Sequence, residues 1–125
     1  MKLRCSQNSL RLRVLKSETE TLKRGEELVE KVHVGTAVFS YGLTQSESGA
    51  VYATFEKGHI EVHIPKNELA VWLDTEQVGI EVKQPLEDGG TLQILIEKDF
   101  PCVTRTTEDK SDTFRELASK NDQAC

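Results

Sequence analysis

Residues 60–82 read Ile60-Glu-Val-His-Ile-Pro-Lys-Asn-Glu-Leu-Ala-Val-Trp-Leu-Asp-Thr-Glu-Gln-Val-Gly-Ile-Glu-Val82, and a degraded copy lies fifty positions earlier without a gap. The copy runs from Leu10 to Val32. Matched positions include Leu10/Ile60, Leu12/Val62, Val14/Ile64, Lys16/Lys66, Glu18/Glu68, Leu22/Trp72, Glu26/Glu76, Leu28/Val78 and Val32/Val82. A repeat of this length indicates a duplicated supersecondary unit. We therefore expect two similar halves.

Length and composition describe a small globular chain. Its 125 residues are enough for one domain with one modest core, and 37% of them are hydrophobic and 30% charged. No apolar run approaches the roughly 20 residues that span a bilayer, and the opening residues hold no apolar segment of the kind that a secretory signal needs. We expect a cytoplasmic protein without a membrane partner, in which Cys5, Cys102 and Cys125 are free thiols.

The charges are divided unevenly along the chain. Residues 1–24 carry seven basic and two acidic side chains, whereas the rest of the chain carries nine basic and nineteen acidic ones. The net charge of −5 therefore hides a basic N-terminal region.

The hydrophobic pattern predicts the same order of elements in both copies: strand, strand, helix, strand, strand. The predicted strands are 2–5, 10–14, 28–34, 37–43, 51–55, 59–64, 78–84 and 91–98. A capping box of Ser17 and Glu20 predicts a helix up to about residue 24, and Asn67 is predicted to cap a second helix through about Leu73. We expect an α+β fold, a pseudo-twofold antiparallel β-barrel built from two ββαββ repeats with one short helix each.

The domain organisation follows from this pattern. We expect one domain over residues 1–103, with repeat 1 at 1–45 and repeat 2 at 51–98, and a polar tail at 104–125 with a short helix near 112–120. An internally duplicated half-barrel of this kind is compatible with a monomer or a homodimer.

Short motifs resemble a known family. The run Asn8-Ser-Leu-Arg-Leu-Arg-Val14, with Lys16-Ser-Glu18 opening a helix and Glu26-Glu-Leu-Val-Glu30 before a strand, resembles the half-barrel of the AbrB/MazE superfamily. Ile64-Pro-Lys-Asn-Glu68 resembles the strand-to-helix part of that half-barrel. The resemblance implies a swapped-hairpin barrel that binds DNA, often as an antitoxin or regulator, with both halves here in one chain. Separately, Ile96-Glu-Lys-Asp-Phe-Pro-Cys102 resembles a stretch in a group of uncharacterised bacterial proteins, which implies no activity.

The basic N-terminal hairpin is the strongest candidate site. A two-residue turn at Gln7-Asn8 would place Arg4 opposite Arg11 and Lys2 opposite Arg13, with Leu3, Cys5, Leu10 and Leu12 on the core face. Like charges opposed across a hairpin are destabilising, and a bound phosphate backbone would relieve them. The candidate anion-binding or nucleic-acid-binding residues are Lys2, Arg4, Arg11, Arg13 and Lys16. The alternative is internal neutralisation by Glu26, Glu27, Glu30 or the acidic second half.

Metal, cofactor and catalytic sites are not expected. His59 and His63 share a strand face but stand roughly 13 Å apart at about 3.3 Å per residue, too far to bind one ion. Cys102 has no recognisable base, and Glu97 and Asp99 are expected at a solvated rim.

Three functions stay open from the sequence. The first is a non-enzymatic binding or regulatory module with weak affinity for nucleic acid or another polyanion. The second is a protein-interaction module that contacts a partner through the tail and the acidic second half. The third is a small-molecule enzyme with a pocket between the repeats.

Overall fold

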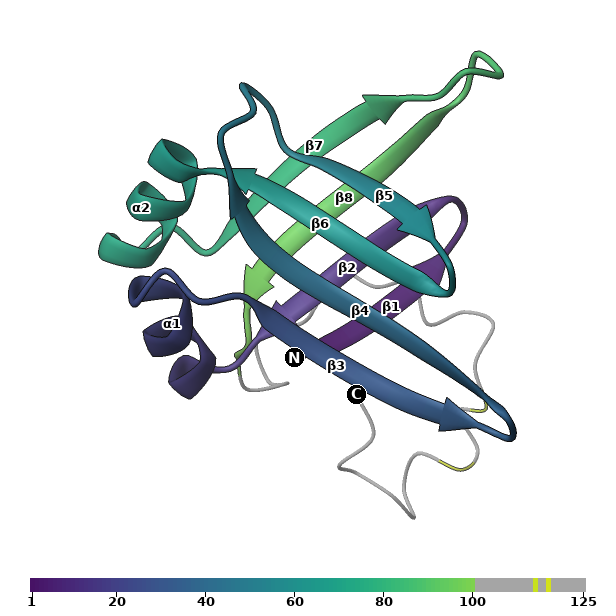
Figure 1. Ribbon diagram of the computed structural model, residues 1–125. Helices are drawn as coiled ribbons and strands as arrows, with labels where there is room; N and C mark the ends of the chain where they lie inside the picture. Colours follow the sequence, from purple (N-terminus) through teal and green to yellow (C-terminus); the bar gives the residue numbers. More distant parts are fainter. Residues whose placement is uncertain (101–113, 115–116, 118–125) are drawn as a thin grey trace.

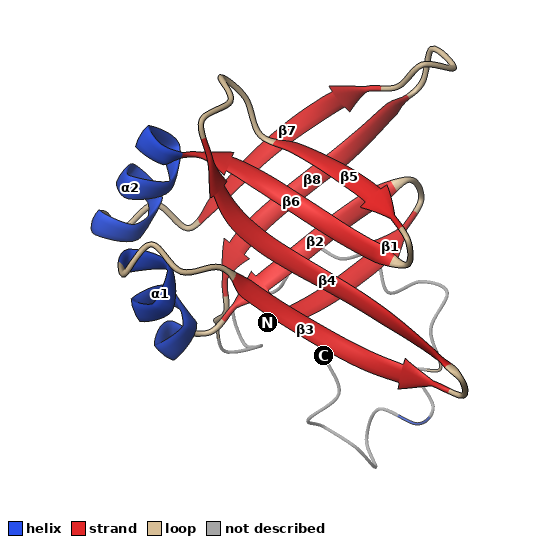
Figure 2. Ribbon diagram, viewed as in Figure 1, coloured by secondary structure: helices blue, strands red, loops and turns tan. Residues whose placement is uncertain are grey.

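The computed structural model describes residues 1–100 together with Phe114 and Leu117. The strands are β1 (Lys2–Ser6), β2 (Ser9–Val14), β3 (Leu28–Val34), β4 (Ala37–Ser46), β5 (Tyr52–Glu56), β6 (His59–Pro65), β7 (Gly79–Pro85) and β8 (Thr91–Lys98). The helices are α1 (Lys16–Lys23) and α2 (Lys66–Asp74), which lie side by side at one end of the strands (Figures 1 and 2). The predicted ββαββ order is confirmed in both copies. None of the helices in the described part is long and apolar enough to cross a membrane.

The strands form two sheets of four that face each other. One sheet has the order β1-β2-β8-β7 and the other has the order β3-β4-β6-β5. The copies therefore exchange hairpins, because the first hairpin of each copy pairs with the last hairpin of the other. No ladder between described residues joins the two sheets, so closure into a barrel stays a prediction.

The expectation of a wholly antiparallel arrangement is wrong. Within each hairpin the strands are antiparallel, but β2 and β8 run parallel, as do β4 and β6. A short turn can join only antiparallel neighbours. The central pairs have no such constraint, because each joins hairpins from different copies.

Side chains connect the two sheets at both edges. At one edge, the Gln84 amide of β7 accepts the Ala53 N–H of β5 at 2.7 Å and donates to the Ala53 carbonyl at 3.2 Å. At the other edge, the Met1 amino group forms ion pairs with Glu18 and with Glu30, and the Tyr41 hydroxyl donates to the Met1 carbonyl at 3.0 Å. These contacts satisfy polar groups that edge strands otherwise leave unpaired.

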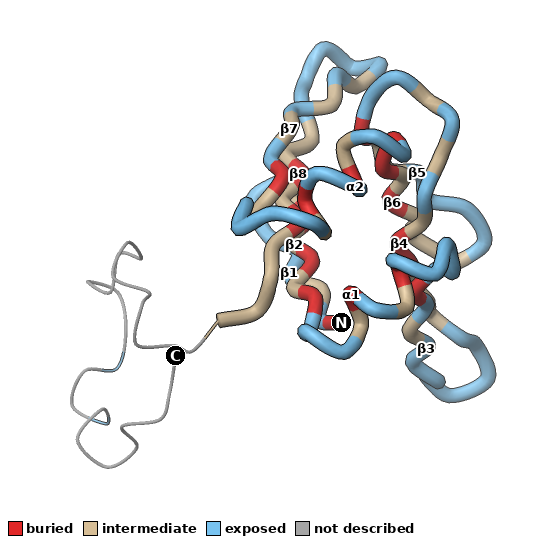
Figure 3. Tube along the Cα trace, turned by 90° about the vertical axis from the view of Figure 1, so that its left-hand side faces the viewer, coloured by how far each residue is buried: buried red, intermediate tan, exposed pale blue. Residues whose placement is uncertain are grey.

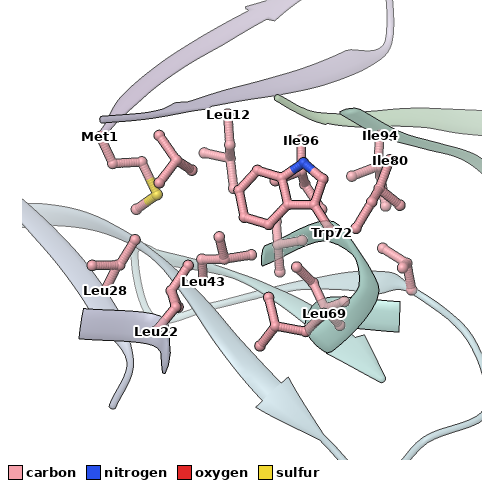
Figure 4. Close-up of a cluster of buried hydrophobic side chains, with 14 residues drawn as sticks. Met1, Leu12, Leu22, Leu28, Leu43, Leu69, Trp72, Ile80, Ile94 and Ile96 are labelled. Atoms are coloured by element: carbon pink, nitrogen blue, oxygen red, sulfur yellow. The ribbon is translucent and has the colours of Figure 1, made fainter. Parts of the chain in front are cut away.

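The core lies between the sheets and is closed at one end by the helices. Figure 3 shows buried positions along β2, β8, β4 and β6, and their apolar side chains belong to one core cluster. Trp72 of α2 is fully buried among aliphatic side chains from both sheets (Figure 4). Its indole N–H donates to the Val78 carbonyl at 3.0 Å, so this large side chain leaves no unsatisfied donor in the core.

Equivalent positions of the two copies have equivalent surroundings. Leu12 and Val62 are both buried on the inner side of a central strand, and Leu22 and Trp72 are both buried on the inward side of a helix. The repeat read from the sequence therefore corresponds to a structural repeat.

Both helices begin earlier than the predicted caps. In α1 the N-cap is Leu15, whose N–H donates to the Glu18 carboxylate at 2.9 Å. Glu18 thereby performs the N3 role that the sequence assigned to Glu20. In α2 the N-cap is Pro65 with φ of −56°, so Asn67 lies within the first turn rather than at the cap.

The cysteines and the C-terminal region were the subject of two further expectations. Cys5, predicted on the core face, is exposed, because it lies on the edge strand β1 close to the turn, where it pairs with Leu10. Cys102, the polar tail and most of its predicted helix at 112–120 lie outside the described residues.

Candidate anion-binding site

The basic hairpin adopts the predicted register. Gln7 and Asn8 have φ of 49° and 59°, the left-handed pair that a two-residue turn requires. Arg4 lies opposite Arg11 and Lys2 lies opposite Arg13. Because Leu10, Leu12 and Val14 are buried, alternation places these basic side chains on the outer face of the sheet.

The neighbouring strand β8 brings an acidic side chain to this face. Glu97 lies beside Arg13 in the parallel ladder, and its carboxylate accepts from the Arg13 Nε at 3.0 Å. The same carboxylate is 3.4 Å from the Arg11 Nε, and Asp99 lies 3.9 Å from Arg13. The Arg13 side chain is only 15% exposed, so it is largely committed to contacts within the fold.

This partial neutralisation comes from the acidic second half, one of the sources expected from the sequence. The other expected sources act elsewhere. Glu30 pairs with the Met1 amino group, and Glu26 pairs with Arg24 at 3.4 Å. Glu97, expected at a solvated rim, is instead a half-buried partner of two arginines.

Arg4 and Arg11 line a cavity of about 360 Å³ on the outer face of the hairpin. Its other lining residues are Ser6, Ser9, Leu10, Gln93 and Leu95. Gln93 and Leu95 come from β8 and lie beside Ser9 and Arg11 because β2 and β8 pair in parallel. Sequence reasoning missed these two residues, since the pairing of β2 with β8 joins positions more than eighty residues apart.

The five predicted site residues do not form one cluster. Arg4 and Arg11 share the cavity, Lys2 is exposed farther along β1, and Arg13 faces Glu97. Lys16 begins α1 and lines a different cavity of about 380 Å³, together with Lys23 and Lys98. The structure therefore narrows the candidate anion site to the Arg4–Arg11 pair.

The histidines of β6 lie on the outer face of the other sheet. His59 bonds to Ser40 and Glu61, whereas His63 stacks on Tyr52 with ring centroids 4.3 Å apart. Among the described residues no group of three or more His, Cys, Asp or Glu could hold a metal ion.

Comparisons with known proteins identify a family but no activity. Residues 1–117 match a family of unknown function, DUF7009, and the chain belongs to this family. No curated protein and no solved structure matches the chain.

Proposed function

We propose that this DUF7009 protein is a binding module that takes a phosphate-bearing ligand in the Arg4–Arg11 cavity. The observation that carries the proposal is the pairing of Arg4 with Arg11 across the hairpin, in a cavity whose lining also includes Ser6, Ser9 and Gln93. Guanidinium groups donate pairs of hydrogen bonds that match phosphate oxygens, and the Ser6 hydroxyl can add a neutral donor. The Ser9 hydroxyl already donates to the Ser6 carbonyl at 2.6 Å, and the Gln93 amide donates to Glu81.

The charge distribution supports a small contact rather than a long one. The equivalent strand positions of the second copy hold Tyr52, Thr54, Glu61 and His63, so only one of the two hairpins is basic. A single-stranded ligand that contacts about two phosphates through this hairpin should show a slope of about −1.4 when log affinity is plotted against log salt, since each contact contributes about −0.7. Nucleic acid is therefore proposed as a weakly bound polyanion, contacted at one short stretch of backbone.

The test uses fluorescence anisotropy with a labelled single-stranded oligonucleotide at several salt concentrations. The variant Arg4→Ala/Arg11→Ala should lose at least tenfold in affinity. Arg24→Ala is the matched control, because Arg24 is an exposed arginine paired with Glu26 outside the cavity, and it should change affinity less than twofold. Equal affinity of the cavity variant and the Arg24→Ala control would overturn the proposal.

Glu97 provides a second arm of the same experiment. Its carboxylate lies 3.4 Å from the Arg11 Nε and competes for that guanidinium. Glu97→Gln should therefore bind the oligonucleotide more tightly than the unmodified protein, and weaker binding would contradict the assigned role of Arg11.

We also propose that the fold is an AbrB/MazE-like swapped-hairpin barrel whose two halves are fused, with residues 1–103 as one domain. The exchanged hairpins and the edge contacts of Gln84 and Met1 support this relation. The cytoplasm is the proposed compartment, supported by the exposed free thiol of Cys5, since reducing compartments keep such thiols unpaired.

A protein-interaction module is the second candidate. It is favoured by the far end of the β3–β4 hairpin, where Val32, Val34 and Val38 are 46%, 62% and 44% exposed. β3 is also an edge strand, and one side of its backbone has no strand partner within residues 1–100. Val34→Lys should abolish a pulled-down partner without lowering the unfolding midpoint, and an unchanged set of partners would remove this candidate.

A further inference from the structure

Three side chains form a hydrogen-bonded chain on the outer face of the β3-β4-β6-β5 sheet. Ser40 of β4 lies beside His59 of β6, and the Ser40 Oγ is 2.6 Å from the His59 Nδ1. The His59 Nε2 is 3.2 Å from the Glu61 Oε1. A nucleophile beside a base that is oriented by a third group is the arrangement that activates a hydroxyl.

The carboxylate determines which protons the chain carries. An ionised Glu61 can only accept hydrogen bonds, so the His59 Nε2 must donate to it. In the neutral imidazole the Nδ1 then holds the free lone pair, and the Ser40 hydroxyl donates to it. In this tautomer the His59 Nδ1 can accept the proton of the Ser40 hydroxyl.

Glu61 is held in place by the backbone of β4. Its side chain lies across Gly42, where an added Cβ would be only 2.5 Å from the Glu61 Oε2. That oxygen is buried and has no hydrogen-bond partner among the described residues. Buried acceptors in native folds almost always have a partner, so this oxygen calls for an explanation. Stabilising a protonated His59 during a reaction provides one.

The pseudo-twofold gives an independent reason to regard this place as a site. The β-ladders put Thr54 at the place of Arg4, His59 at that of Ser9, Glu61 at that of Arg11, Ser40 at that of Gln93 and Gly42 at that of Leu95. The Ser40–His59–Glu61 chain thus occupies the position that forms the arginine-lined cavity in the other sheet.

We propose that Ser40 is a nucleophile that hydrolyses small carboxylic esters, with His59 as its general base and Glu61 as a positioning residue. The His59 side chain is 32% exposed and Ser40 is partly exposed, so a small substrate reaches both from solvent. Lys31 of β3 lies opposite Ser40 in the ladder, and we assign its ammonium the role of stabilising the developing oxyanion.

The reaction proceeds in two steps. The Ser40 Oγ bonds to the acyl carbon while its proton moves to the His59 Nδ1, and the alcohol leaves as its C–O bond breaks and takes that proton. Water then loses a proton to His59 and attacks the acyl group on Ser40, which releases the carboxylic acid and restores the serine hydroxyl. This activity is separate from the Arg4–Arg11 cavity, which lies on the other sheet.

A fluorescent fluorophosphonate tests the nucleophile directly in the full chain. The Ser40 Oγ would bond to phosphorus, fluoride would leave and the Oγ proton would pass to His59. Ser46 is the internal control, because its hydroxyl lies 2.6 Å from the Ser48 hydroxyl rather than beside an imidazole. Peptide mass spectrometry should show Ser40 labelled at least tenfold faster than Ser46, and equal rates would overturn the proposal.

Variants separate the chemistry from stability. His59→Gln should lower Ser40 labelling by about 10²-fold or more, the scale of general-base catalysis. His63→Gln is the matched control, since His63 lies on the same strand and face but contacts Tyr52 and Thr54; it should leave labelling unchanged. Labelling that falls equally in both variants would overturn the assignment of His59.

Glu61→Gln keeps the size of the side chain and removes its charge. Labelling should fall about tenfold or more, and the ¹⁵N shifts of His59 should change from the Nε2–H tautomer to a mixture. A role limited to stabilising the sheet would lower the unfolding midpoint but would leave the ratio of Ser40 to Ser46 labelling unchanged, and that result would remove Glu61 from the mechanism.

Discussion

Gly42 offers the sharpest test of the packing on the outer face of β4 and β6. A methyl group at this position would lie 2.5 Å from the Glu61 Oε2 and 3.0 Å from the Leu28 carbonyl oxygen. The carboxylate would have to turn away, which breaks its hydrogen bond to His59, and the Leu28 backbone cannot move without disturbing the β3–β4 ladder. Overpacking and the lost bond together cost about 2–4 kcal/mol, against a gain of about 0.5–1 kcal/mol for replacing a glycine in a strand. Gly42→Ala should therefore destabilise the fold by about 1–3 kcal/mol.

A double-mutant cycle isolates the contact between the two residues. Four proteins are compared by urea unfolding: the unmodified chain, Gly42→Ala, Glu61→Ala and the double variant. The fluorescence of Trp72, the single and fully buried tryptophan, reports unfolding in each. In the double variant the contact between the added methyl and the Glu61 side chain is gone. The double variant should therefore be about 1–2 kcal/mol more stable than the sum of the two single effects predicts. Additive effects within about 0.5 kcal/mol would refute the placement of Glu61 over Gly42.

Three further predictions concern the core and the edges. Trp72→Ala should lower the free energy of unfolding by about 3–5 kcal/mol, because it empties the centre of the core. A loss below about 1 kcal/mol, measured by calorimetry, would contradict this expectation. Gln84→Ala should cost about 1–3 kcal/mol and speed hydrogen exchange at the Ala53 amide, which the Gln84 oxygen accepts at 2.7 Å; an unchanged exchange rate would argue against that bridge. Burial, and then the charges of the nearby Glu30 and Glu18, raise the pKa of Tyr41 above its ordinary value of 10.0. The folded state therefore retains this proton longer than the unfolded state, so stability from Tyr41 is present below about pH 10 and is lost as pH rises further. Ultraviolet titration of a Tyr52→Phe variant should show a midpoint above 10, and a lower midpoint would contradict the burial of the hydroxyl.

The local structure could be predicted from the sequence because its determinants are local. The turn at Gln7-Asn8, the alternation of Leu10, Leu12 and Val14, and Gly25 at the end of α1 are each decided by a few adjacent residues. The predicted register of the first hairpin was therefore correct at every pair. The repeat extended the same reasoning to the second copy.

The helix caps and the central strand pairs were not predictable by these rules. Glu18 and Glu20 are both acidic residues near the helix start, and only the backbone geometry selects Glu18 as the partner of Leu15. The pairing of β2 with β8 depends on how two distant hairpins exchange, and no short motif encodes it. Glu97 consequently could not be identified as a partner of Arg11 and Arg13, and the extent of charge on the hairpin was overestimated.

Duplication explains why the inner and outer faces of this fold differ so much in their chemistry. Inward positions such as Leu12 and Val62 must fill one shared core, and both are apolar and buried. Outward side chains in the same ladders do not have to fill the core, so they can differ between the copies. Arg11 in one copy corresponds to Glu61 in the other. The substitution of one for the other reverses the charge while the backbone register stays the same. One scaffold can therefore present an arginine-lined cavity on one sheet and a serine bonded to a histidine on the other, since each arrangement needs only outward side chains and the fixed spacing of the parallel strands that flank it.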